Sequence, residues 1–135
     1  MHKKILFVND SAKAQNLQCM LENMRELWDM RFVEAEADIW NALANDNYDV
    51  LVFDLKTPEI NGIELLHEVS VRYPHVVRVI ITGPSDQELV LRAIRSNHQI
   101  ITQPFNPLSL KGLIDRSCKL REILHNEELK RFVAG

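Results

Sequence analysis

Residues 48–54 read Tyr-Asp-Val-Leu-Val-Phe-Asp, a continuous apolar run of strand length that ends in a carboxylate. Strands that are covered on both faces, as in a parallel sheet, have continuous rather than alternating apolar sequences. Comparable runs, rich in β-branched or aromatic residues, lie at residues 5–8, 30–33, 76–81 and 100–101. We therefore predict five buried strands.

Segments with helical periodicity separate these runs. Apolar residues recur at i, i+3, i+4 and i+7 spacing within residues 17–27, 39–43, 63–69, 90–94 and 110–124. Candidate caps precede the helices, namely Ser11, Asn61-Gly62, Ser85 or Asp86, and Asn106-Pro107. Strands that alternate with helices through short connections predict right-handed βαβ crossovers and a doubly wound α/β fold with a parallel five-stranded sheet. We take the strand order to be 2-1-3-4-5, one of the common orders of this fold.

Length and composition fit one globular domain. The chain has 135 residues, of which 46% are hydrophobic and 26% charged. With a formal net charge of −3 and no basic stripe, direct nucleic-acid binding is not expected. The apolar runs are too short for a membrane span or a signal peptide, which predicts a cytoplasmic location. Cys19 and Cys118 lie far apart in helical segments, so we expect buried free thiols.

Polar residues follow the predicted strands where each one ends. They are Asn9 and Asp10 after the first strand, Asp54 after the third, Thr82 after the fourth and Gln103 after the fifth. Because all strands of a parallel sheet end at the same edge, and the first and third are expected to be neighbours, Asp10 and Asp54 should come together. Two adjacent carboxylates repel each other unless a cation lies between them, and oxygen ligands of this kind suit Mg²⁺. Taken singly, each residue also fits a helix cap or a polar strand end.

The same residues carry a resemblance to a known family. The residues that match the family pattern are Ile5 to Asp10, Tyr48 to Asp54 with Pro58 and Gly62 after it, Val79 to Gly83, and Gln103-Pro104-Phe105. In this combination the chain resembles the receiver domains of two-component response regulators from Lys4 to about Leu124. The resemblance implies a flavodoxin-like (βα)5 sandwich.

The resemblance also implies a function. Asp54 would accept a phosphoryl group from a sensor histidine kinase or a phosphotransfer protein, and the domain would relay the change to an output domain or partner. Mg²⁺ would be bound by Asp10, Asp54 and the backbone carbonyl of Lys56, with Asn9 contacting it through water. The Thr82 hydroxyl would hold a phosphoryl oxygen. Such a protein is a signalling domain rather than an enzyme, and at most catalyses its own phosphorylation and dephosphorylation.

Three positions depart from the family pattern. Asn9 stands where a second acid is usual, Gln103 where a lysine is usual, and Ile100 where an aromatic switch residue is usual. A glutamine amide donates a hydrogen bond but brings no positive charge. The loss of one acid offsets the loss of the lysine, because Asp10 and Asp54 leave the pocket at the usual formal charge of about −2. Lys56 is either a further source of positive charge for the site or a solvated turn lysine.

The C-terminal part predicts a connection to another domain. We expect residues 1–124 to form the receiver domain, with a last helix from Pro107 to about Leu124. Residues 125–135 are then a helical linker, in which His125-Asn126-Glu127 leads into a second helical stretch from Glu128 to Val133. Residues 72–99 and this tail are similar to receivers that precede HDOD or HD-type output domains.

Other functions remain open at this point. A phosphorylation-independent receiver, used for dimerisation or docking, is the main alternative, because Gln103 and Ile100 depart from the pattern. A homodimer through the fourth and fifth helices is a further expectation. A dehalogenase-like phosphatase would need a D-x-D-x-T signature, which Lys56 and Pro58 break, and a nucleotide-binding flavodoxin would need a glycine-rich loop after the first strand.

His98 is expected to be an exposed histidine at a helix end, rather than a pH sensor.

Overall fold

The computed structural model describes residues 2–57, 59–95 and 98–134, without the side chains of residues 11–14, 89, 93–95 and 125–134. The elements in chain order are β1 Lys3–Val8, α1 Ser11–Met20, a 3-10 helix Glu22–Met24, β2 Trp28–Val33, α2 Glu36–Asn45, β3 Val50–Asp54, α3 Gly62–Arg72, β4 Val77–Thr82, α4 Gln87–Arg95, β5 Gln99–Thr102 and α5 Pro107–Ala134. All the strands pair in parallel, in the order β2-β1-β3-β4-β5. The predicted flavodoxin-like fold and strand order are confirmed.

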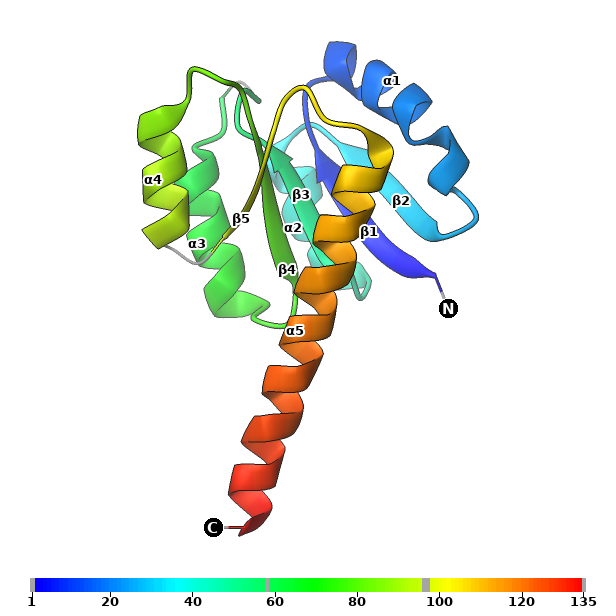
Figure 1. Cartoon of the computed structure of the whole chain (residues 1–135). Helices are drawn as coiled ribbons and strands as arrows, with labels where there is room; N and C mark the ends of the chain where they lie inside the picture. The colour runs from blue at the N-terminus through cyan, green and yellow to red at the C-terminus, as the bar shows by residue number, and fades with distance from the viewer. Residues whose placement is uncertain (1, 58, 96–97, 135) are drawn as a thin grey trace.

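Helices cover both faces of the sheet. Figure 1 shows α1 and α5 on one side and α2, α3 and α4 on the other. Along β3 the side chains alternate between these two layers: Leu51 and Phe53 pack with α2 and α3, whereas Val50 and Val52 pack with the layer of α1 and α5. Every residue of β3 is buried. The continuous apolar run therefore reflects a strand with a core on each face.

Two of the predicted helix starts are confirmed by their hydrogen bonds. The side chain of Asn61 accepts a hydrogen bond from the backbone of Glu64 at 3.3 Å and caps α3. The side chain of Asn106 accepts one from the backbone of Ser109 at 2.8 Å, and Pro107 occupies the first position of α5, where no backbone N–H is needed.

The first predicted helix is shorter than its apolar spacing suggested. α1 ends at Met20, and the 3-10 helix follows it, so the period from Leu17 to Leu27 does not belong to one helix. Leu27 is 47% exposed. Cys19 is exposed, which corrects the expectation of two buried thiols, while Cys118 is a free thiol on the buried side of α5.

The last helix is longer than predicted. α5 runs from Pro107 to Ala134 without a break at His125-Asn126-Glu127. Once a helix has formed, each further residue adds one hydrogen bond at little cost, so weakly helical residues need not end it. In Figure 1 the last turns of α5 extend past the sheet, and Leu120, Ile123 and Leu124 are exposed there.

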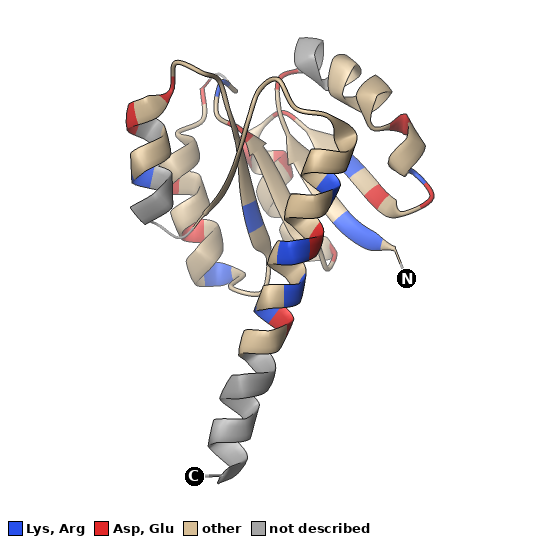
Figure 2. Cartoon of the chain, in the orientation of Figure 1, with Lys and Arg blue, Asp and Glu red and all other residues tan. Residues whose placement is uncertain are grey.

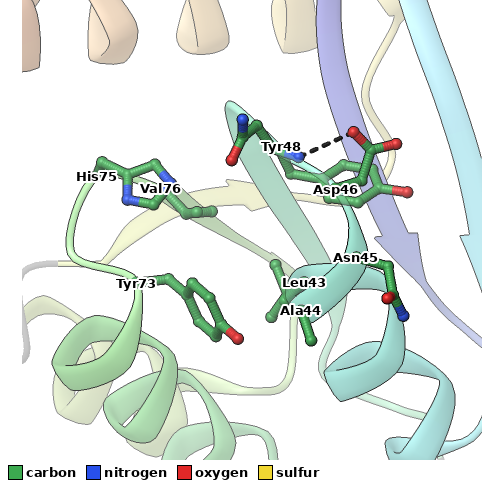
Figure 3. Close-up of a pocket in the computed structure, with 9 residues that line it drawn as sticks. Leu43, Ala44, Asn45, Asp46, Tyr48, Tyr73, His75 and Val76 are labelled. Atoms are coloured by element: carbon green, nitrogen blue, oxygen red, sulfur yellow. Dashed lines mark hydrogen bonds between the residues drawn. The ribbon is translucent and has the colours of Figure 1, made fainter.

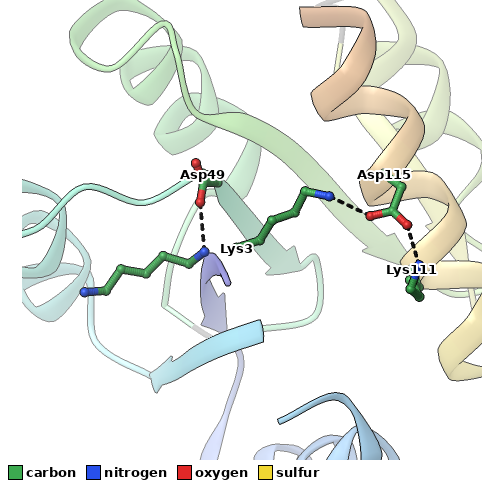
Figure 4. A network of polar contacts seen from close by, with 5 residues as sticks. Lys3, Asp49, Lys111 and Asp115 are labelled. Carbon is green, nitrogen blue, oxygen red and sulfur yellow. Dashed lines mark hydrogen bonds and ion pairs between the residues drawn. The ribbon is translucent and has the colours of Figure 1, made fainter. Parts of the chain in front are cut away.

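Ion pairs fasten α5 to the edge where the strands begin. Asp115 accepts hydrogen bonds from Lys3 of β1 at 2.7 Å and from Lys111 of its own helix at 2.6 Å (Figure 4). These two ammonium groups lower the pKa of Asp115 against the opposing effect of burial. Arg121 adds a hydrogen bond to the backbone carbonyl of Asp49 at 3.3 Å.

Charged residues of both signs are interspersed along the described part of the chain. Figure 2 shows Lys and Arg separated by Asp and Glu on the coloured part of the chain, with no single basic stripe. No helix in the described ranges is long and apolar enough to cross a membrane.

Candidate phosphoacceptor site

The carboxyl ends of β1 and β3 bring Asn9, Asp10 and Asp54 to one edge of the sheet. Val8 pairs with Phe53, so the residues that follow each of them are neighbours. The backbone of Asn9 donates to the carbonyl of Val33 at 3.2 Å, which continues the ladder with β2. Asn9 and Asp54 are 3% and 5% exposed, and Asp10 is half-buried. As the strand-end rule predicted, these residues lie at the same edge of the sheet.

The loop after β3 holds the carboxylate of Asp54. One carboxylate oxygen of Asp54, Oδ1, accepts a hydrogen bond from the backbone N–H of Lys56 at 3.0 Å. The carbonyl oxygen of Asp54 accepts from the hydroxyl of Thr57 at 2.7 Å and from its backbone N–H at 3.0 Å. The Thr57 hydroxyl also lies 3.5 Å from the carbonyl oxygen of Val8. The loop is therefore bound to the ends of both central strands.

Thr57 is a residue that the sequence analysis missed. It is only 4% exposed, although it lies in a turn. A threonine before a proline is an ordinary turn residue, and nothing in its neighbours indicates that its hydroxyl bridges β1 and β3. Its structural effect is to fix the backbone of Lys56 beside Asp54.

Oxygen atoms dominate the predicted metal site. Oδ1 of Asn9 is buried and has no hydrogen-bond partner in the described part of the chain. Buried polar atoms normally have a partner, which can be an ordered water. No group of three or more His, Cys, Asp or Glu side chains gathers among the described residues. Mg²⁺ needs no such group, because it is bound by one or two carboxylates and keeps several waters. The donor set of two carboxylates, a carbonyl and a buried amide oxygen fits Mg²⁺.

Thr82 ends β4 at the same edge. It is 1% exposed, and its hydroxyl lies 3.2 Å from the hydroxyl of Thr102 on β5, so either group can donate. The backbone of Gln103 donates to the carbonyl of Thr82 at 2.8 Å, which places Gln103 directly after β5. The side chain of Gln103 is exposed. Thr102 was not predicted, because its role depends on its register with Thr82.

Lys56 is exposed and extends toward the loop that follows β4. Its ammonium lies against Gly83, the residue after Thr82. Asp86, predicted as a candidate cap of α4, uses its carboxylate to accept a hydrogen bond from the backbone of Gly83 at 2.8 Å. Ile100, at the switch position, is half-buried against the core layer of α2 and α3 and offers no polar atom.

The expectation for His98 was wrong. His98 lies just before β5, is 5% exposed, and accepts a hydrogen bond at Nδ1 from Nε of Arg78 at 3.2 Å. Burial, with smaller contributions from the positive charges of Arg78 and His67, lowers its pKa to about 4. A histidine that accepts at Nδ1 carries its proton on Nε2, and this atom has no partner among the described residues. His98 is thus a neutral core residue.

This burial predicts that acid destabilises the domain. Between pH 6.5 and 4 the unfolded chain binds a proton at His98 that the folded chain does not. The free energy of unfolding therefore decreases as the pH is lowered through this range, by up to about 3 kcal/mol. Urea unfolding at pH 7, 5.5 and 4.5 measures this loss. His98→Gln should flatten the dependence, and His75→Gln, at an exposed histidine, should not. Equal slopes for wild type and His98→Gln would contradict the prediction.

Two hollows lie at the edge of the sheet opposite to Asp54. One, of about 340 Å³, is lined by residues that include Asp46, Tyr48, Tyr73 and His75, before the starts of β3 and β4 (Figure 3). A second hollow, of about 990 Å³, lies along residues 117–124 of α5, beside Asp49. Neither is lined by Asp10, Asp54 or Thr82.

The parallel sandwich, with carboxylates at the ends of β1 and β3, defines a flavodoxin-like α/β domain with an acidic site at its strand ends. The family model for the response regulator receiver domain matches residues 5–115. The chain belongs to this family and is the receiver domain of a two-component phosphorelay, a signalling domain of the CheY-like type.

Individual relatives agree with this assignment. The chain is 28% identical over 118 residues to a chemotaxis protein CheY homolog of Campylobacter jejuni, covering 83% of this chain and 89% of that protein. It is 26% identical over 105 residues to the hydrogenase transcriptional regulatory protein HoxA of Cupriavidus necator, covering 76% of this chain and 21% of HoxA. The chain therefore spans about a fifth of the length of that regulator.

A solved structure shows the same fold. The signal receiver domain of an HD domain-containing protein from Pseudomonas fluorescens superposes with a TM-score of 0.79 at 20% identity, covering 93% of both chains.

Proposed function

We propose that Asp54 is the phosphoacceptor of this receiver domain. The observation that carries the proposal is the buried carboxylate of Asp54, with one oxygen held by the backbone of Lys56. A carboxylate oxygen of Asp54 attacks the phosphorus of a phosphohistidine on a kinase or phosphotransfer protein. The new P–O bond forms as the P–N bond breaks, and the imidazole leaves with the electron pair and takes a proton from solvent. Phosphoryl transfer of this kind needs positioning and charge neutralisation more than covalent help.

The residues around Asp54 supply these two requirements. Mg²⁺ would be held by Asp10, Asp54 and the backbone carbonyl of Lys56, with Asn9 reaching it through water. When bound, the ion neutralises part of the charge on the phosphoryl oxygens. The Thr82 hydroxyl donates to one phosphoryl oxygen, and its neighbour Thr102 positions it from β5. The Gln103 amide supplies a second, neutral donor.

The proposed output is a change at the face formed by α4, β5 and α5, which transmits phosphorylation to a partner. The length of α5 supports the division into a receiver at residues 1–124 and a helical linker at residues 125–135 that leads to an output domain. The likeness to the receiver of an HD domain-containing protein supports an HD-type or HDOD output. The same face, through α4 and α5, is the proposed surface of a homodimer.

One observation favours a second candidate. Gln103 is exposed and neutral, so the end of β5 brings no positive charge to the site. A receiver without that charge fits a docking module whose partner binding does not depend on phosphorylation.

Phosphoryl incorporation separates the two candidates. The protein is incubated with a small phosphodonor, with and without Mg²⁺, and its intact mass is measured. We expect one added phosphoryl group that requires Mg²⁺ and that borohydride reduction, followed by peptide mapping, locates at Asp54. A protein that stays unmodified at saturating donor, or is modified elsewhere, would support the docking module instead.

A further inference from the structure

The proposed phosphoryl site lacks a side-chain cation on the strands that form it. A phosphorylated aspartate carries a charge of about −2 at neutral pH, beside the carboxylate of Asp10. Gln103 follows β5 and is neutral. The described strand ends, Asn9-Asp10, Asp54 and Thr82, contribute no ammonium or guanidinium group. Among the side chains that the structure describes, the loop after β3 is a candidate source of positive charge.

The loop after β3 carries such a charge across the site. The backbone of Lys56 is bound to Oδ1 of Asp54 at 3.0 Å. Its side chain reaches the loop after β4, where Nζ lies 3.0 Å, and the carbon next to it 3.2 Å, from the place that a Cβ on residue 83 would occupy. The ammonium is therefore beside Gly83, one residue beyond the Thr82 hydroxyl.

The absence of a side chain at Gly83 leaves room for this arrangement. An added Cβ would stand closer to Nζ than ordinary van der Waals contact allows. Gly83 does not have a positive φ, so the backbone there accepts alanine. The atoms that would have to move most are at the flexible end of Lys56, and Oδ2 of Asp86, at 3.3 Å, would give by a few tenths of an ångström. Alanine at position 83 is thus expected to displace the ammonium and keep the fold.

The ammonium is close to an anion but is not bound to it. A carboxylate oxygen of Asp86, Oδ2, lies 3.3 Å from the same Cβ position and accepts the hydrogen bond from Gly83. Among the described residues, however, Lys56 forms no ion pair. Asp86 therefore attracts the Lys56 ammonium toward the loop after β4. The N–H donors of the ammonium stay available for a phosphoryl oxygen.

We propose that the ε-ammonium of Lys56 binds the phosphoryl group on Asp54, and that Gly83 provides the space in which it does so. The proposal rests on the phosphoacceptor function of Asp54. The ammonium makes charge-assisted hydrogen bonds and takes part in no bond making or breaking. In this chain the cation comes from the loop after β3 instead of the end of β5.

Beryllofluoride with Mg²⁺ is the probe for this contact, and its binding is followed by ¹⁹F NMR. Lys56→Ala should weaken the affinity about 10- to 100-fold, the usual value of a hydrogen bond to a charged group. Lys56→Arg should recover most of it. Gly83→Ala, which keeps the lysine, should weaken binding in the same direction. Lys119→Ala, at an exposed lysine of α5, is the matched control and should bind like wild type.

The outcomes separate this proposal from the phosphoacceptor function. If wild type binds the probe through Asp54 and Lys56→Ala binds equally well, Lys56 has no role and the phosphoacceptor function stands. If Lys56→Ala weakens binding and Gly83→Ala does not, the role of Gly83 is wrong. If wild type itself does not bind, both proposals fail.

Binding of Mg²⁺ alone, read from backbone amide shifts, should persist in Lys56→Ala, because the carbonyl of residue 56 remains. Loss of Mg²⁺ binding in this variant would indicate a structural role for Lys56 instead.

Discussion

Asp54→Ala is expected to abolish phosphoryl incorporation and to leave the fold intact. The substitution removes the only nucleophile of the proposed reaction. It also removes one hydrogen bond, which the backbone of Lys56 donates to the carboxylate of Asp54. The hydrogen bonds from Thr57 end on the main-chain carbonyl of residue 54 and persist in the variant. The midpoint of thermal unfolding should therefore stay close to that of wild type.

The measurement compares Asp54→Ala with wild type under saturating phosphodonor and Mg²⁺, by intact mass and by electrophoretic mobility. Asp38→Ala is the matched control, because Asp38 is an exposed aspartate in the first turn of α2. It should be phosphorylated at the wild-type rate. Wild-type incorporation in Asp54→Ala would mean that another residue is the phosphoacceptor.

Phe53→Ala should lower the free energy of unfolding by about 3–5 kcal/mol, the usual range for a buried phenylalanine. Phe53 is completely buried in the central strand, in the layer that packs against α2 and α3. Its ring also fills the space beside Gly62, where an added Cβ would lie 2.5 Å from a ring carbon. The cavity left by alanine is thus bordered by a sheet and a helix start that cannot easily close over it.

Urea unfolding at constant pH measures this effect through the shift of the midpoint at an unchanged slope. Leu108→Ala is the control, since Leu108 is 72% exposed in the first turn of α5. It should change the free energy of unfolding by less than about 0.5 kcal/mol. A small loss for Phe53→Ala would show that the layer repacks around the vacated space.

The sequence predicted the fold because its signals are local and repeated. The β3 sequence has an apolar residue at each of four consecutive positions, and both faces of that strand are covered. Right-handed crossovers limit the possible strand orders without selecting one, and the resemblance to receiver domains pointed to 2-1-3-4-5. The same logic predicted that Asn9, Asp10, Asp54 and Thr82 share one edge of the sheet, because parallel strands end together.

The errors came from residues whose environment is formed by distant parts of the chain. His98 has a helix-end sequence, yet Arg78 of β4 and the start of β5 enclose it. Thr57 lies in a turn, but its hydroxyl bonds to the end of β3 beside β1. The break expected in α5 was a different error, because a few weak helix formers do not end a helix that has already formed.

The amino-acid sequence by itself determined the elements, the sheet and the acidic strand ends of this receiver domain, since hydrophobic periodicity and strand-end chemistry act within a few residues. Only the tertiary structure decided which side chains meet around Asp54. Lys56 and Gly83 are far apart in the sequence, and their contact exists because β3 and β4 pair in one register and the loops that follow them turn toward each other. The position of the ammonium is a property of that register, and no local pattern encodes it.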